Sequence, residues 1–503
     1  MLLVLPAGKV TVEGNIEIEH NFRDSKVTEG LNVAETEVEV QDTVYDYDVE
    51  DKDLGYVIEY RGNKNKAINL LEKDGYEVID SIEVINRLLI KEVDVTPDEF
   101  RPVEVYPEIV SIEENSAVYP TDYTIPSDSK FEEQWSKFAM RLPQAWRDVT
   151  GSSNIRIAVI DTGIYENNIE LEQFVNRDDG WNFYEDNNDT HDYWGGSRGH
   201  GTQAAGIISA QGNYANVAGV MWESELIPLK MFGEDSGSTW ALTKSILYSG
   251  GFEVDGMQIE PVDVISASVS GPDTQSTRDA VEKLSAQTDV IFVTSAGNDG
   301  RDGVDSLTYP AKYPETIAVG SVSNRGDDRR PVRSSFSSYG EGLDLVAPGR
   351  SVISTHQENN TRFVTGTSFS SPQVAGLVGL MLANGINPGD VRDILSRTAI
   401  DLWPREDDYE NGWYVQYGYG LVNAYWAVND VSEINISIGD NETTVDLNAD
   451  SYVIEDVPAG EYELKAWIDV RGNGIEAGDY VATEQVVLEN GEYNIDLTLK
   501  EVR

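Results

Sequence analysis

The sequence contains no cysteine among its 503 residues, which excludes disulfides, thiolate metal sites and cysteine nucleophiles. Long hydrophobic runs are also missing, because no stretch approaches the roughly 20 apolar residues that a membrane span requires. Met1 to Leu5 are apolar, but Pro6 follows at once, so this run is too short for a signal-peptide core and no leader is visible here. Stability therefore has to come from core burial, bound ions or both.

Basic residues are scarce, since 37 Lys and Arg face 89 Asp and Glu and give a net charge of −52. An evenly acidic surface repels nucleic acid and anionic membranes, so we expect partners of neither kind. Two interpretations of the charge stay open, adaptation to strong brine and an ordinary acidic secreted protein. We favour adaptation to brine, because repulsion among so many carboxylates would lower folding stability at low ionic strength.

The chain is too long for one compact core, and its patterns divide it into zones. Residues 1–53 combine a strand pattern at 10–19 with an acidic, core-poor stretch, and predict a short hairpin and a linker. Residues 54–118 predict a small α+β unit of β-α-β-β-α-β order. Its expected elements are a helix at 63–73 and strands at 56–60, 76–79, 88–91 and 109–113.

Residues 127–430 form the largest zone, where short apolar runs such as 157–160 and 290–293 alternate with helical stretches. Such runs are typical of buried strands in a parallel sheet, so the predicted fold class is α/β with a doubly wound parallel sheet. Residues 432–503 carry strand patterns and Gly and Asn turns without a helix pattern. They predict a separate, small β-sandwich-like domain.

Four side chains of the largest zone lie where a strand ends or a helix begins. Asp161 ends an apolar strand, His200 leads into a helix, and Ser368 precedes a long apolar helix. A serine hydroxyl needs an imidazole to take its proton, and a carboxylate holds that imidazole in the right tautomer. Asn298 follows another strand and provides, with the backbone N–H of Ser368, two donors for an oxyanion.

The segments Asp161-Thr-Gly, His200-Gly-Thr and Gly366-Thr-Ser-Phe-Ser-Ser-Pro372 resemble the three signatures of the subtilisin-like (S8) serine protease family, in its Asp, His, Ser order. The likeness covers residues 127–430 and implies a subtilisin-like fold. It also implies a secreted, monomeric serine endopeptidase that hydrolyses proteins or peptides without an organic cofactor. Ser368 attacks, His200 carries the proton, and Asp161 orients the imidazole.

The resemblance implies a substrate site as well. Residues 264–272 are similar to the strand that pairs with an extended peptide, and Thr308 lines a roomy, uncharged pocket just before an expected cis bond at Tyr309–Pro310. The implied substrate-binding residues are Ser268, Val269, Ser270, Gly271, Ala296, Gly297 and Thr308. Gln203, Gln373 and Phe369 depart from common family residues, and we interpret these departures as changes in packing.

Residues 54–118 resemble the inhibitory propeptide domain of the same family in element order and position. This likeness implies a zymogen whose own propeptide is a partner. The tail of the propeptide would lie in the active-site cleft until autocleavage between residues 116 and 125.

Calcium is the expected structural ion, at two places. The family motifs align Asp128, Glu170 and Asn213 with calcium-binding positions, and their oxygens suit a hard cation. Residues 469–479 resemble a calcium loop with Asp469, Asn473 and Asp479 as ligands, although Arg471 stands where an acid is expected. Chance acids in so acidic a chain are the alternative explanation.

Two other functions stay open at this point. One is a catalytically inactive subtilisin-like fold that acts as a binding module, and the intact Asp161, His200, Ser368 and Asn298 argue against it. The other is a surface adhesion protein built on the β-rich zones, which are small beside the protease-like zone.

Overall fold

The structure is a computed structural model, and it divides the chain into two compact units, residues 28–120 and residues 1–27 with 121–503. Each unit is described by itself. The described residues are 9–19, 56–60, 64–73, 76–82, 87–92, 109–114, 123–193, 199–233, 236–300, 305–324, 330–402, 413–449, 451–471, 479–488 and 492–501.

The unit 28–120 contains a four-stranded antiparallel sheet in the order β3-β4-β2-β5. Its one described helix buries Ala67 and Leu71. The expected helix and four strands are confirmed, and the second helix of the predicted order falls outside the described residues. The elements are β2 (Tyr56–Tyr60), α1 (Lys64–Lys73), β3 (Tyr76–Ile82), β4 (Arg87–Glu92) and β5 (Ile109–Glu114).

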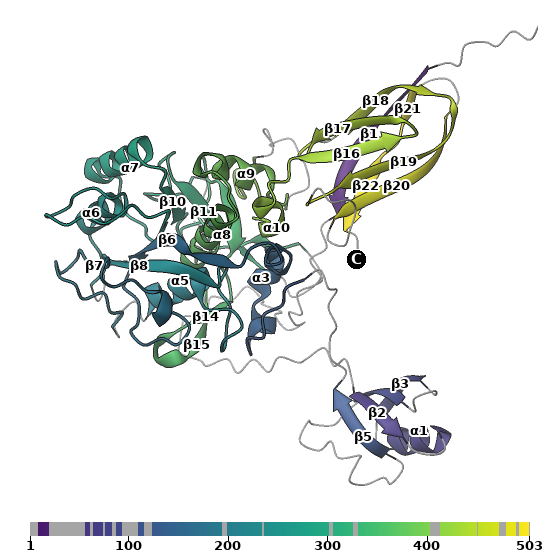
Figure 1. Ribbon diagram of the computed structural model, residues 1–503, viewed down its shortest axis with the longest axis horizontal. Coiled ribbons are helices and arrows are strands. Elements are labelled where there is room, and N and C mark those ends of the chain that lie inside the picture. Colours follow the sequence, from purple (N-terminus) through teal and green to yellow (C-terminus); the bar gives the residue numbers. More distant parts are fainter. Residues whose placement is uncertain are drawn as a thin grey trace, which may run out of the picture. The chain divides into compact units, whose positions relative to one another are not determined.

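The largest zone is built on a central sheet whose strands are parallel apart from β12, as the apolar runs predict (Figure 1). The strand order is β12-β11-β10-β9-β6-β8-β7, and β13 also pairs with β11. The strands are β6 (Gly151–Asp161), β7 (Trp181–Asn182), β8 (Glu223–Lys230), β9 (Val264–Ala267), β10 (Ile291–Ser295), β11 (Ile317–Ser323), β12 (Val332–Arg333) and β13 (Leu345–Pro348).

Side chains of β6 alternate between two apolar layers, which is why helices cover both faces of the sheet. Ile157 and Val159 pack with the helices α5 and α8, whereas Ala158 and Ile160 pack with α6 and α7. This doubly wound arrangement is the predicted α/β class. The four helices are α5 (His200–Ser209), α6 (Thr239–Ser249), α7 (Gln275–Gln287) and α8 (Ser371–Ala383).

Shorter elements surround this sheet. A hairpin of β14 (Val352–Thr355) and β15 (Thr361–Val364) packs on α5. The remaining short helices are η3 (Phe131–Glu133), α3 (Trp135–Ala139), α4 (Leu142–Ala145), η4 (Glu172–Phe174), η5 (Gln357–Asn359), η6 (Thr367–Phe369), η7 (Pro388–Asp390), α9 (Val391–Arg397) and α10 (Ala424–Val428).

The C-terminal zone is a β structure that recruits a strand from the other end of the chain. Its strand order is β17-β16-β19-β20-β22-β1-β18, with β21 also paired to β1. The expected hairpin within residues 1–53 is therefore absent from the described part, because both edges of β1 pair with C-terminal strands. The strands are β1 (Lys9–Glu19), β16 (Glu433–Ile438), β17 (Asn441–Asp446), β18 (Ser451–Pro458), β19 (Gly460–Ile468), β20 (Tyr480–Leu488), β21 (Glu492–Asn494) and β22 (Leu497–Glu501).

This β structure packs against the end of the sheet-bearing zone. The ring of Trp426 in α10 lies 5.3 Å from that of Tyr480, and Arg471 forms an ion pair with Asp148 at 2.9 Å. In the described parts of the chain, no helix combines the length and apolarity of a membrane span.

Candidate active site

Asp161 and His200 meet at the end of the central strand β6. His200 Nδ1 lies 2.8 and 2.9 Å from the two carboxylate oxygens of Asp161, whose side chain is only 1% exposed. Gly201 makes this approach possible, because a Cβ at that position would lie 2.2 Å from the carbonyl oxygen of Gly163. The small residue after His200 therefore lets the start of α5 lie directly against the strand end.

The buried carboxylate controls the charge of the imidazole. Burial by itself lowers the pKa of His200, but the charge and hydrogen bond of Asp161, with a contribution from Asp192, outweigh it and leave the pKa raised. A hydrogen bond from Nδ1–H to Asp161 also leaves Nε2 as the free proton acceptor of the neutral ring.

Ser368 lies beside this pair, in the turn η6 that leads into α8. The ring of the next residue, Phe369, lies 5.1 Å from the His200 ring, and the carbonyl oxygen of Ser368 accepts a hydrogen bond from Ser268 Oγ at 2.8 Å. The structure thus brings the turn that holds Ser368 next to His200 and Asp161, which come from two other segments far apart in the chain.

Asn298 is oriented by its contact with the residue before Ser368. Its Oδ1 accepts hydrogen bonds from the backbone N–H of Thr367 at 3.0 Å and from Thr367 Oγ1 at 3.1 Å. Since the oxygen of the amide is fixed in this way, Nδ2 is the atom left to donate. Within the described residues it has no hydrogen-bond partner, as an oxyanion donor requires.

Four of the residues expected to bind substrate, Ser270, Gly271, Ala296 and Thr308, lie along one hydrogen-bonded wall. Gly271 N–H donates to Tyr309 O at 2.9 Å, and Thr308 Oγ1 donates to Ser270 Oγ at 2.9 Å. Thr308 N–H also donates to Ala296 O at 3.3 Å, next to Gly297. Val269 differs, because it is buried in the apolar layer under α6 and α7 and so faces away from this wall. The expected cis bond at Tyr309–Pro310 is confirmed.

Asp192 is a buried acid that no motif of the sequence marks. Its carboxylate accepts hydrogen bonds from Thr162 Oγ1 at 3.0 Å and from Thr202 Oγ1 at 2.6 Å. Thr162 follows Asp161, and Thr202 lies two residues after His200, so Asp192 links the two elements that carry the pair. Burial raises its pKa to about 6. We therefore regard Asp192 as a positioning residue.

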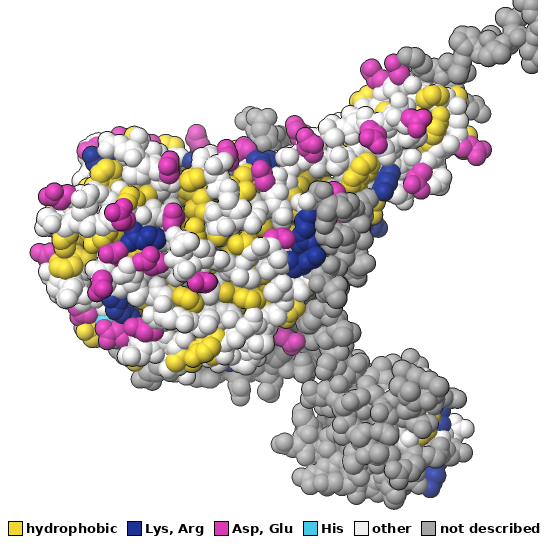
Figure 2. Space-filling model, viewed as in Figure 1, with side chains coloured by type: hydrophobic (Ala, Val, Ile, Leu, Met, Phe, Trp, Pro, Cys, Tyr) yellow, Lys and Arg dark blue, Asp and Glu magenta, His cyan; other side chains and the backbone are white. Residues whose placement is uncertain are grey.

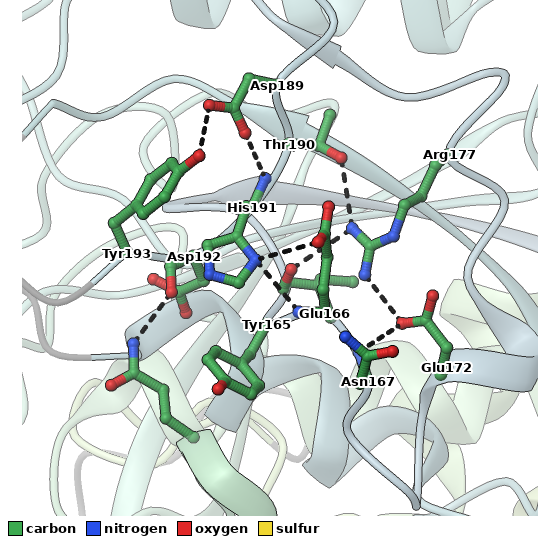
Figure 3. Close-up of polar contacts among 12 residues, drawn as sticks. Tyr165, Glu166, Asn167, Glu172, Arg177, Asp189, Thr190, His191, Asp192 and Tyr193 are labelled. Carbon is green, nitrogen blue, oxygen red and sulfur yellow. Dashed lines mark hydrogen bonds and ion pairs between the residues drawn. The ribbon is translucent and has the colours of Figure 1, made fainter.

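The segment around Asp192 is held by a polar network (Figure 3). Gln357 Nε2 donates to the backbone oxygen of Asp192 at 2.9 Å, and Tyr193 OH donates to Asp189 at 2.8 Å. His191 Nδ1 accepts from Glu166 N–H at 3.2 Å, and burial lowers the pKa of this imidazole. His191 is therefore part of the support of the loop.

Asp128, Glu170 and Asn213, three of the residues implied for calcium, lie around one loop. Asp128 accepts hydrogen bonds from the backbone N–H groups of residues 213–215, and Asn213 Oδ1 accepts from Ser127 N–H at 2.7 Å. Glu170 Oε1 accepts from Asn216 N–H at 2.8 Å, whereas its Oε2 is buried and has no partner among the described residues. Burial raises the pKa of this carboxyl.

The second implied calcium site is described only in part. Asp479 is fully buried, and its Oδ1 accepts a hydrogen bond from Val470 N–H at 2.9 Å, next to Asp469. Asn473 lies outside the described residues. Across the described ranges, no group of three or more His, Cys, Asp or Glu side chains is arranged to hold a metal ion.

Comparison with known proteins decides the family. Residues 152–420, more than half of the chain, match the Subtilase family, Peptidase S8. The chain is a subtilase. It is similar to an alkaline protease of Alkalihalobacillus alcalophilus, with 30% identity over 72% of this chain and 84% of that protein. Thermitase of Thermoactinomyces vulgaris is 31% identical, over 60% of this subtilase and 99% of thermitase.

A solved structure supports the same assignment. A protease from Pseudoalteromonas arctica aligns with 61% of this subtilase and 99% of its own length, at a TM-score of 0.53 and 25% identity. The resemblance that the sequence motifs indicate is therefore confirmed, and the subtilase is a serine protease of the subtilisin-like kind.

Proposed function

We propose that this subtilase is a secreted endopeptidase that cleaves proteins through Asp161, His200 and Ser368. The observation that carries the proposal is the contact of His200 Nδ1 with both oxygens of buried Asp161, beside the turn that holds Ser368. His200 Nε2 takes the proton of Ser368 Oγ as that oxygen attacks the peptide carbonyl, and Asp161 stabilises the imidazolium. Asn298 Nδ2 and the Ser368 N–H donate to the oxyanion.

The substrate follows from the wall beside this site. Backbone groups of residues 268–271 would pair with an extended peptide. Such pairing recognises the main chain of the substrate rather than a particular sequence. The family resemblance implies a pocket lined by Thr308, whose hydroxyl carries no charge, and such a pocket favours uncharged side chains at the cleavage site. A protein or peptide substrate satisfies both features.

A fluorophosphonate probe tests the proposal, because it reacts only with an activated serine. We expect labelling at Ser368 alone, located by mass spectrometry of peptides. Labelling requires neutral His200, so the labelling rate should fall as the pH is lowered through the pKa of this residue. Because that pKa is raised, the fall should occur at a higher pH than for a free imidazole. A folded protein that takes up no probe at any pH would instead be the inactive binding module.

Maturation by autocleavage is part of the proposal. The antiparallel sheet β3-β4-β2-β5 with α1 directly precedes the protease zone, which supports an inhibitory propeptide domain at residues 54–118. A cut between 116 and 125 by Ser368 would separate the two. Residues 54–118, as part of the cleaved N-terminal fragment, would then act as an inhibitor of the mature enzyme.

Calcium binding is proposed at Glu170, because this residue fits a cation ligand. The Oε2 atom of Glu170 is buried without a partner among the described residues, and burial raises the pKa of this carboxyl. A cation bound beside Oε2 would stabilise the charged carboxylate and offset the cost of burying it. Asp128 and Asn213 fit less well as direct ligands, since their oxygens already accept backbone hydrogen bonds. A bound calcium ion would stabilise the fold, without a part in the chemistry.

Glu170→Gln should remove the stabilisation by calcium. A carboxyl whose pKa is raised on folding costs stability above that pKa, so without calcium the variant should melt at the same temperature as the parent or higher. Adding calcium should raise the melting temperature of the parent but not of Glu170→Gln. The exposed Glu282→Gln is the matched control and should respond as the parent does. An equal calcium response in Glu170→Gln would contradict the assignment.

Adaptation to concentrated salt is the last part of the proposal. Acidic side chains are spread over the visible surface of the described residues, with basic ones in a few small groups (Figure 2). With a net charge of −52, their repulsion opposes the compact state unless it is screened. The Debye length falls from about 30 Å at 0.01 M salt to about 3 Å at 1 M.

We therefore expect the melting temperature and the activity on a neutral peptide to rise from low to molar sodium chloride. The titration is run at saturating calcium, so that filling of specific sites does not contribute. A melting temperature that stays flat or falls over this range would remove the salt-adapted interpretation and leave the protease assignment intact.

A further inference from the structure

The strand β1 belongs to the C-terminal sheet although it precedes the propeptide-like unit in the sequence. Figure 1 draws it in purple among the green and yellow strands of that sheet. Residues 54–118 and the whole protease zone lie between β1 and its partners in the chain. Any cut between residues 116 and 125 therefore places β1 and its partners on different fragments.

β1 is an interior strand rather than an edge strand. On one side it pairs antiparallel with β18, from Lys9 with Pro458 to Asn15 with Ser451. On the other side it pairs in parallel with β21 and then with β22. Hydrogen bonds on both edges mean that removal of β1 would leave two unpaired strand edges in the C-terminal sheet.

The side chains of β1 alternate between the core and solvent. Val12 is fully buried and Ile16 is 6% exposed, and both belong to the same apolar core as the C-terminal strands. Glu13 and Glu17, between and after them, are exposed. The strand therefore fits its place in one register, since a shift by one residue would bury carboxylates.

Gly14 makes the fit closer than an ordinary strand allows. A Cβ at Gly14 would lie 1.8 Å from the carbonyl oxygen of Ile495, so any other residue would collide with the backbone. Ile495 N–H donates to Glu13 O at 2.7 Å. Asn15 adds two hydrogen bonds of 3.0 Å, from its backbone N–H and its Nδ2, to Asp496 Oδ1.

From this arrangement we propose that β1 holds the cleaved N-terminal fragment on the mature enzyme. The proposal rests on the autocleavage proposed above. Hydrolysis of a bond between 116 and 125 breaks none of the backbone hydrogen bonds of β1. The mature subtilase is then a two-chain protein, in which the C-terminal sheet binds residues 9–19 as a donated strand and keeps the propeptide tethered.

A tethered inhibitor behaves differently from a released one. Residues 20–55 connect β1 to β2, a length that could span up to about 120 Å if fully extended. Rebinding of the propeptide to the cleft is then governed by an effective concentration that dilution does not change. Activity would begin only when the propeptide is degraded or β1 leaves the sheet.

The test uses full-length Ser368→Ala protein with a recognition sequence for a site-specific protease inserted after residue 116. Because an added protease makes the cut, the experiment needs no activity of Ser368. It therefore tests whether β1 retains the N-terminal fragment, and its outcome does not depend on the proposed catalysis. Excess peptide substrate, which this protein cannot cleave, keeps the cleft occupied during gel filtration. We expect both fragments to elute together at the mass of the uncut chain.

Variants of β1 show whether the strand is what holds them. Val12→Asp places a carboxylate in the core and should release the N-terminal fragment. Glu17→Asp only shortens a carboxylate side chain at an exposed position and should not release it. Ile16→Ala keeps the core apolar and is the second test if Val12→Asp fails to fold. We expect the N-terminal fragment of this variant to dissociate from the rest of the protein at least ten times faster than that of the parent. Separation of the cut parent, or full retention in both Val12→Asp and Ile16→Ala, would overturn the proposal.

Discussion

Ser368→Ala should abolish peptide hydrolysis and leave the precursor as one uncut chain. Without the hydroxyl, His200 has no proton to remove and no acyl-enzyme can form. The expected loss of turnover is on the order of 10⁶, the size established for the same change in subtilisin. Activity on a peptide substrate and gel electrophoresis of the purified precursor measure the two effects.

Ser370→Ala is a matched control for that change. Ser370 lies two residues further along the same turn, and its buried Oγ has no hydrogen-bond partner among the described residues. Removing it should leave hydrolysis and maturation close to the parent. A Ser368→Ala protein that still matures without added protease would show that another enzyme makes the cut.

Asn298→Ala should reduce turnover by about 10² to 10³ while the protein still folds, the range established for one oxyanion donor in subtilisin. The donor acts on charge that develops in the transition state, so kcat should fall while KM changes little. The melting temperature controls for loss of the contact with Thr367. Unchanged turnover would mean that Asn298 only supports the turn before Ser368.

The sequence could point to the candidate catalytic residues because each lies near the end of a locally encoded element. Asp161 ends an apolar run and Ser368 lies in the turn just before an apolar helix, so short motifs define their surroundings. Asp192 could not be found in this way, since its burial depends on Gln357 and Thr202, which other parts of the chain supply. In a chain with 89 acids, one buried carboxylate has no distinctive local pattern.

The strands that pair with β1 could not be predicted from local sequence patterns either. Alternation at residues 10–19 predicts a strand with one buried side, and Val12 and Ile16 confirm it. Alternation does not say which edge the strand joins, and the nearest strand in sequence is the usual expectation. Here the partners of Val12 are Ile454 and Tyr493, more than four hundred residues away.

The pairing of β1 also sets an order of events during synthesis. β1 emerges from the ribosome before almost all of the chain, whereas its neighbours β21 and β22 emerge among the last residues of this sequence. Contacts of such long sequence separation form late in folding, because a large loop has to close first. The pairing of β1, the first of the described strands, is thus completed last, and a product that stops before residue 492 would leave one edge of β1 without its partners.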